Sequence, residues 1–239
     1  MYSRIKLSAR VILSGSYFKI LPLLTLIIFS VCIFTVCNSV LGIFIDRNEL
    51  FLAVSAVTFI AFVMIVSPAR LHLETRHFML ARGMKNIKSG TGVSGFGKSL
   101  FFYPLIFCIK LFWFAVFEAV PISSAVILYF CLNNNPLSLK AFVVICIGTV
   151  FLAVVGLGFY SVFIQRYSKA SFYLVCYDDF SPLDAIGESV RRTKDSLTDI
   201  LIFKLGFLPW FLLCIGIVPS LFVIPYYKQS LILFFINKK

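Results

Sequence analysis

Long apolar runs separated by short polar or basic stretches are the dominant pattern along the chain. A membrane-spanning helix needs about 20 residues. Four runs have about this length or more: 20–45, 50–67, 104–132 and 140–164. The stretch from Leu197 to Ile236 is almost entirely apolar, and as one helix of about 60 Å it would be twice as long as a bilayer core is thick. We therefore expect a tight hairpin near Gly216 and Pro219, with spans at 197–216 and 219–236.

These runs predict an all-α fold: a polytopic integral membrane protein with six transmembrane helices in a single domain, 1–239. The third and the last helices are expected to be kinked, the third at Pro121, because a proline inside a helix removes one backbone hydrogen bond. Between the fourth and fifth spans, Ser181, Pro182 and Asp184 predict the capped start of a polar helix that runs to about Lys194.

The composition indicates a bilayer protein rather than a soluble or disordered one. Hydrophobic residues make up 60% of the 239 residues, charged residues make up 13%, and the mean hydropathy is +0.99. Soluble domains are about half apolar and about a quarter charged, and disordered segments have the opposite bias.

The net charge of +12 is distributed unevenly about the predicted spans. Seventeen of the 22 Lys and Arg residues fall before the first span, between the second and third, between the fourth and fifth, and at the C-terminal end. This asymmetry predicts a cell-membrane protein with both termini in the cytoplasm. Membrane lipids with anionic headgroups on the inner face are the expected partners, with a membrane protein as a second kind of partner and no nucleic acid. The candidate lipid-contact residues are Arg70, Arg76, Arg82, Lys85, Lys88 and Lys98.

Two overlapping glycine motifs do not predict a nucleotide site. Residues 90–95 fit G-x-G-x-x-G, and residues 92–99 fit G-x-x-x-x-G-K-[ST] with Lys98 and Ser99 in the last two positions. A phosphate loop needs a buried strand before it, but 84–88 is not strand-like and a membrane span follows. We expect no nucleotide, although the glycine-rich backbone and Lys98 could hold a lipid phosphate.

No catalytic, cofactor or metal site is predicted. His72 and His77 would point about 140° apart on a helix, so we expect solvated interfacial histidines rather than a zinc site. None of the seven cysteines belongs to a Cys-x-x-Cys pair, and Asp178 and Asp179 precede a helix cap, where a turn role is expected. We therefore expect a protein without cofactor that is not an enzyme.

Four charged residues inside the predicted spans form the candidate intramembrane polar site: Lys110, Glu118, Lys204 and Lys228. Charges within a bilayer are costly and often functional. The three lysines fall in the inner half of the membrane, where they could also snorkel to the headgroups. Glu118 lies just past the midplane. It is open to three interpretations: a protonated acid beside Pro121, the partner of a lysine on another span, or part of a polar pathway.

A family resemblance rests on Ala185, Ser189, Gly206–Trp210, Gly216, Pro225–Tyr226 and Phe234–Phe235, and near the N-terminus on Ala9, Leu13, Gly15 and Lys19–Leu21. At these positions the chain resembles a bacterial family of integral-membrane proteins, the domain of unknown function 975, which is related to the membrane domain of some glycerophosphodiester phosphodiesterases. Where that family has a basic residue and a glycine, this chain has Thr193–Ser196. The resemblance implies a multi-span membrane protein without assigned activity, in which Trp210 and Tyr226 are packing or interface anchors.

Two functions follow as hypotheses. The favoured one is a non-enzymatic accessory or binding module that contacts lipids or a membrane partner through its basic cytoplasmic face. The alternative is a small-solute transporter or channel subunit that uses Glu118 and Lys110. An enzyme acting on lipids is a third class, for which the sequence offers no convincing nucleophile, metal cluster or acid–base pair.

Overall fold

A computed structural model of the chain describes residues 2–44, 48–84, 93–134, 139–214 and 217–237, and all regular elements in these ranges are helical. The elements, in chain order, are α1 (Tyr2–Ser14), α2 (Tyr17–Phe44), α3 (Asn48–Arg82), α4 (Val93–Asn134), α5 (Leu139–Phe163), η1 (Ile164–Tyr167), α6 (Ala170–Cys176), α7 (Pro182–Thr193), η2 (Lys194–Ser196), α8 (Leu197–Leu205), α9 (Leu208–Leu213) and α10 (Ile217–Asn237). Five segments are long and apolar enough to cross a membrane: Tyr17–Ile43, Glu49–Arg82, Gly95–Phe130, Ala141–Cys176 and Pro219–Asn237. The prediction of an all-helical membrane protein is confirmed for the described residues.

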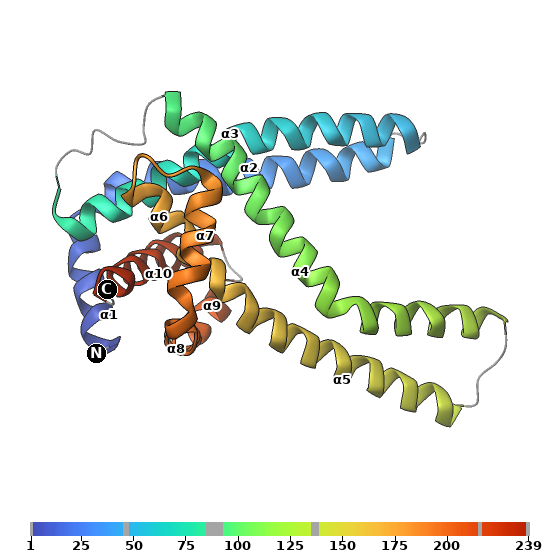
Figure 1. Cartoon of the computed structure of the whole chain (residues 1–239). Coiled ribbons are helices and arrows are strands. Elements are labelled where there is room, and N and C mark those ends of the chain that lie inside the picture. The colour runs from blue at the N-terminus through green and yellow to red at the C-terminus, as the bar shows by residue number, and fades with distance from the viewer. Residues whose placement is uncertain (1, 45–47, 85–92, 135–138, 215–216, 238–239) are drawn as a thin grey trace.

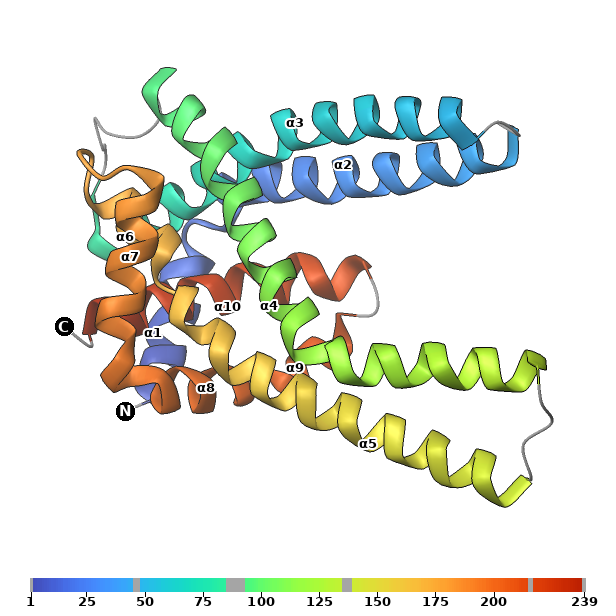
Figure 2. The same cartoon turned by 45° about the vertical axis from the view of Figure 1, so that its right-hand side comes forward.

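Two long apolar hairpins project in the same direction from one end of the molecule (Figure 1). The first hairpin consists of α2 and the N-terminal half of α3, and the second of α4 and α5. The outer ends of α2 and α3 lie apart from those of α4 and α5 in both views (Figures 1 and 2). Large apolar side chains on both hairpins point outward and are more than half exposed, among them Phe29, Ile60, Phe112, Val144 and Phe151. Such surfaces are suited to contact with lipid chains.

The other end of the molecule, here called the base, comprises α1, residues 66–82 of α3, residues 95–106 of α4, α6, α7, α8 with Phe207, and α10. Its core includes Ala9, Phe102, Ile200, Phe203 and Phe234, each at most 1% exposed. The rings of Tyr2 and Phe234 are in contact, with centroids 6.0 Å apart, so the first and last helices of the chain lie side by side. The base therefore holds both ends of the described chain (Figure 1).

Two helices extend further into the base than the hydropathy pattern predicts. The predicted second span closes at Ser67–Pro68, but α3 continues through Pro68 to Arg82. The predicted third span begins after Pro104, but α4 begins at Val93. The added turns are less apolar than the spans, but they bury residues such as Leu71 and Phe102 against the base, and this packing compensates for a proline in the helix.

The predicted span at 197–216 is not one continuous helix. α8 ends at Leu205 and α9 begins at Leu208, and the Lys6 ammonium donates to the Gly206 carbonyl oxygen at this break (2.9 Å). Neither helix alone is long enough to cross a bilayer core. The predicted turn residue Gly216 lies outside the described residues, and α10 begins just after it. In both views α9 and the start of α10 lie short of the outer ends of α2 and α5 (Figures 1 and 2).

The predicted polar helix before this segment is confirmed. α7 runs from Pro182 to Thr193, with Ser181 as its N-cap. The Asp184 N–H donates to Ser181 Oγ at 3.2 Å, and the Ser181 N–H donates to Asp184 Oδ2 at 3.1 Å, which completes a capping box. This fixed start places one face of α7 in the base core, with Ala185 and Ser189 fully buried.

Candidate functional site

The base contains a cavity of about 450 Å³, here called the basic pocket. It lies between the C-terminal ends of α3 and α10 and the segment from Lys169 to Asp195. Three cations, one carboxylate and several aromatic rings line it: Arg82, Lys169, Arg192, Asp195, Phe172, Tyr173, Tyr177, Phe235, and also Cys176. Because the lining carries more positive than negative charge, the pocket favours an anion.

Lys169 is the most deeply buried cation of the pocket, with only 5% of the residue exposed. Its backbone N–H donates to Ser189 Oγ at 3.2 Å, and this hydroxyl donates to the Arg166 carbonyl oxygen at 2.7 Å. The Lys169 ammonium donates to Ser196 Oγ at 3.2 Å and lies 5.7 Å from the centroid of the Phe235 ring. A buried ammonium is stabilised by nearby negative charge, so Lys169 raises the affinity of this cavity for anions.

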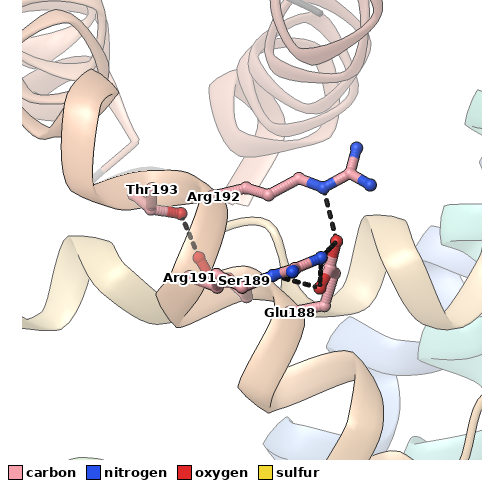
Figure 3. Close-up of polar contacts among 5 residues, drawn as sticks. All are labelled: Glu188, Ser189, Arg191, Arg192 and Thr193. Carbon is pink, nitrogen blue, oxygen red and sulfur yellow. Dashed lines mark hydrogen bonds and ion pairs between the residues drawn. The ribbon is translucent and has the colours of Figure 1, made fainter.

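Arg192 is oriented by Glu188, whose carboxylate also binds Arg191 (Figure 3). Arg191 donates to the two carboxylate oxygens at 2.9 and 3.0 Å, and Arg192 Nε donates to Oε1. The hydrogen bond from Arg191, with help from Arg192, lowers the pKa of Glu188, and the Glu188 carboxylate raises the pKa of both guanidinium groups. Arg192 lies over the Tyr173 ring, 5.7 Å from its centroid, whereas the Arg191 side chain is 73% exposed. Only Arg192 lines the pocket.

The predicted lipid-contact residues are spread over the base. Arg70 lies over the Tyr103 ring at 5.6 Å, Arg76 is exposed, and Lys98 donates to the Asp178 carbonyl oxygen at the turn before α7. Arg82 lies over the Phe78 ring at 4.7 Å and lines the basic pocket. Lys85 and Lys88, and residues 85–92 of the glycine motifs, lie outside the described residues.

Lys169 and Arg192 were not among the predicted site residues. The spacing of Ala185, Ser189 and Thr193, four residues apart, does predict a buried face on α7, and Arg192 stands next to that face. No sequence pattern indicates that Lys169 is buried, because its burial depends on the reversal of the chain between α5 and α7.

The candidate intramembrane site divides into two parts. Lys204 donates to Gln165 Oε1 and to Ser168 Oγ, both at 2.6 Å. Lys228 forms an ion pair with Glu74 of α3, a residue that the sequence did not single out. Lys204 and Lys228 thus each have polar partners on another element, and Glu118 lies about 12 Å further along α4 than Lys110.

Glu118 packs between the two helices of the second hairpin. It is 5% exposed, and its Oε1 has no hydrogen-bond partner among the residues that the structure describes. A Cβ atom at Gly156 of α5 would lie 2.8 Å from Glu118 Oε1 and 2.8 Å from the Phe117 carbonyl oxygen. The glycine thus allows α4 and α5 to approach closely around the carboxyl group. Among the described residues no lysine forms an ion pair with Glu118.

The prediction of a solvated His77 is wrong. His77 is fully buried, and its Nδ1 donates to Gln229 Oε1 of α10 at 2.8 Å. The reason is the extension of α3 beyond Pro68, which carries His77 into the base against α10. Within the described ranges, no group of three His, Cys, Asp or Glu side chains could hold a metal ion.

Some of the residues behind the family resemblance are buried in the base, whereas Leu208 and Trp210 are 56% and 47% exposed and Gly216 lies outside the described residues. Ala9, Ala185 and Ser189 are fully buried, and the rings of Trp210 and Tyr226 contact each other with centroids 6.5 Å apart. A scan of the chain against protein-family models finds no match, and searches among curated proteins and solved structures find none either.

Proposed function

We propose that this membrane protein is a non-enzymatic accessory or binding module that contacts anionic lipids or a membrane partner through a basic cytoplasmic face. The observation that carries the proposal is the concentration of cations at the base. Arg70, Arg76 and Arg82 follow one another along the part of α3 that lies there, and Lys98 lies against the turn before α7. Cations at this end of the molecule would face the anionic headgroups of the inner leaflet.

The proposal includes six membrane crossings in a cell membrane and both termini in the cytoplasm. The contact between Tyr2 and Phe234 supports an even number of crossings, because it puts both ends of the described chain at the base. With five long apolar segments, the broken pair α8 and α9 would supply the remaining pass. The change of direction of α4 in Figure 2 supports a kink at Pro121, and Pro225 inside α10 supports one in the last helix.

We also infer membership of the bacterial family known as domain of unknown function 975. The burial of Ala9, Ala185 and Ser189 supports this inference, since residues that shape a core are the ones a family shares for structural reasons.

Native mass spectrometry of the purified protein tests the lipid contact. The test variant replaces Arg70, Arg76, Lys85 and Lys88 by glutamine and leaves the basic pocket intact. The control variant replaces four cations of other segments, Arg4, Lys19, Arg191 and Lys194. We expect the test variant to retain about tenfold less phosphatidylglycerol than the control, because a cation close to the headgroups contributes up to about 1 kcal/mol. Equal retention by both variants would contradict the proposal.

The alternative function, a small-solute transporter or channel subunit, is favoured by one observation. Glu118 places a buried carboxyl group without a hydrogen-bond partner for Oε1 inside an apolar hairpin, and acidic groups in such places often belong to proton or solute pathways. The variant Glu118→Gln keeps the shape of the side chain and removes its ability to ionise. Lost solute uptake in proteoliposomes at unchanged thermal stability would favour transport over the binding module.

A further inference from the structure

The basic pocket has the properties of a ligand site rather than of a packing defect. Its volume of about 450 Å³ falls within the range of small-molecule sites. Its cations come from three separate parts of the chain: Arg82 from the end of α3, Lys169 from the start of α6, and Arg192 from α7. The lining carries three cations and one carboxylate, so a bound anion would offset the repulsion between the cations.

The fixed positions of these cations indicate what they would bind. Lys169 is buried and held through Ser189 and Ser196, and Arg192 is held by Glu188. Guanidinium groups form forked hydrogen bonds with phosphate oxygens, and an ammonium group binds phosphate as a point charge. Because hydrogen bonds to neighbouring side chains hold Lys169 and Arg192 in place, an anion would bind them with little loss of conformational entropy.

The remaining lining residues argue for an organic ligand rather than for a bare ion. The rings of Tyr173 and Phe235 line the same cavity and offer apolar surface to carbon atoms. Asp195 adds one carboxylate, which would accept a hydrogen bond from a hydroxyl or amino group of the ligand.

We propose that the basic pocket binds a phosphate-bearing organic anion, with Lys169, Arg82 and Arg192 as the ligands of the phosphate group. The phosphate would belong either to a lipid headgroup that enters from the inner leaflet or to a soluble phosphate ester from the cytoplasm. This inference rests on the proposed function and deepens it, because it assigns a defined site to the contact with anionic groups.

A binding titration on the full-length protein, purified and delipidated in a neutral detergent, tests the inference. The probes are dihexanoyl phosphatidic acid, phenyl phosphate as a soluble ester, and dihexanoyl glycerol as an uncharged control, each followed by isothermal titration calorimetry. We expect saturable binding of phosphatidic acid, of phenyl phosphate or of both, and none of the uncharged lipid. Binding of phosphatidic acid alone identifies a lipid ligand, and binding of phenyl phosphate alone identifies a soluble one.

Matched arginine variants give the sharpest control. Arg192→Gln and Arg82→Gln should each weaken binding about tenfold, the effect of losing one charge-assisted hydrogen bond. Arg191→Gln should leave the dissociation constant unchanged, because Arg191 binds the same Glu188 but does not line the pocket. Lys169→Gln should weaken binding most, and size-exclusion chromatography shows whether this buried variant still folds.

Two outcomes would overturn the inference: no saturable binding of either phosphate probe, or equal losses in Arg191→Gln and Arg192→Gln. Neither result would contradict the proposed lipid contact of Arg70, Arg76, Lys85 and Lys88, because the mass-spectrometry test of that contact changes no pocket residue. Conversely, the variant that lacks Arg70, Arg76, Lys85 and Lys88 could retain as much lipid as its control while the pocket binds phosphate. That result would contradict the proposed function and leave the pocket as a phosphate site.

Discussion

The base and the two hairpins consist of similar apolar residues, but these side chains are buried in the base and largely exposed on the hairpins. In the hairpins, side chains such as Phe151 (65% exposed) point outward, and each helix packs mainly on its hairpin partner. In the base, Phe203, Phe207 and Phe234 are at most 1% exposed and contact one another ring to ring. The hairpins thus depend on the bilayer as a solvent, whereas the base has a core like that of a soluble domain.

Buried polar groups differ in the contacts that they make between elements. In the base, Glu74 forms an ion pair with Lys228 and His77 bonds Gln229 through Nδ1, although His77 Nε2 and Gln229 Nε2 have no hydrogen-bond partner among the described residues. In the second hairpin, Glu118 is buried and forms no ion pair with a described residue, and its Oε1 has no hydrogen-bond partner there. A core of packed helices brings polar groups of several elements together, whereas a two-helix hairpin in lipid offers few such groups. The comparison predicts that truncation of an apolar side chain has a large effect in the core of the base and a small one on the outward faces of the hairpins.

The largest difference is expected for phenylalanine truncation. Phe234→Ala should destabilise the protein by about 3–5 kcal/mol, because it leaves a cavity in the base core. Phe151→Ala on the outside of α5 should change stability by less than about 0.5 kcal/mol. Thermal unfolding in detergent, followed by circular dichroism, measures both. Similar losses would show that the hairpin face is covered by protein.

The next largest effect is expected for the ion pair of the base. Lys228→Met leaves the Glu74 carboxylate buried without its partner and should cost about 2–3 kcal/mol. This is less than for a fully buried pair, because the Lys228 side chain is 33% exposed. The double variant Glu74→Gln with Lys228→Met should recover part of the loss, and Lys19→Met on the exposed part of α2 serves as the control. No recovery in the double variant would mean that Lys228 acts through other contacts.

A smaller effect is expected at the helix contact of the second hairpin. Gly156→Ala should cost about 1–3 kcal/mol, because the new Cβ atom would lie 2.8 Å from both Glu118 Oε1 and the Phe117 carbonyl oxygen. Gly148→Ala on the same helix has no atom within 4 Å of its new Cβ and should be neutral or stabilising by up to about 1 kcal/mol. Melting temperatures of the two variants compare them directly. Equal shifts would contradict the close contact around Glu118.

The smallest effect is expected at the surface of the base. Because Arg191 and Arg192 lower the pKa of Glu188, this group stabilises the fold above its unfolded pKa of about 4.3, and the stabilisation is lost as the pH falls through the lower folded pKa. Glu188→Gln should therefore cost about 0.3–0.5 kcal/mol at pH 7, and the difference from the wild type should vanish at strongly acidic pH. Melting curves from pH 7 down to about pH 3 test this sign. A difference that grows on acidification would be inconsistent with it.

Much of the fold could be predicted from local patterns, but the site could not. The runs at 20–45 and 140–164 correspond closely to α2 and α5, and the Ser181 cap marks the start of α7. The passage of α3 through Pro68 was missed, because a proline locally disfavours a helix and only packing in the base outweighs this preference. For the basic pocket, Arg82 was predicted as a lipid contact, but its convergence with Lys169 and Arg192 depends on contacts across more than 80 residues.

By itself, the sequence determined that the chain belongs in a membrane, where its long helices lie and which segments are basic, because hydropathy and charge act through composition over about 20 residues. Only the tertiary structure decided that His77 is buried, that Glu74 pairs with Lys228 and that three cations surround one cavity. These features arise when helices that are distant in the chain pack together. The packing determines which polar groups meet, and a local sequence pattern carries no information about it.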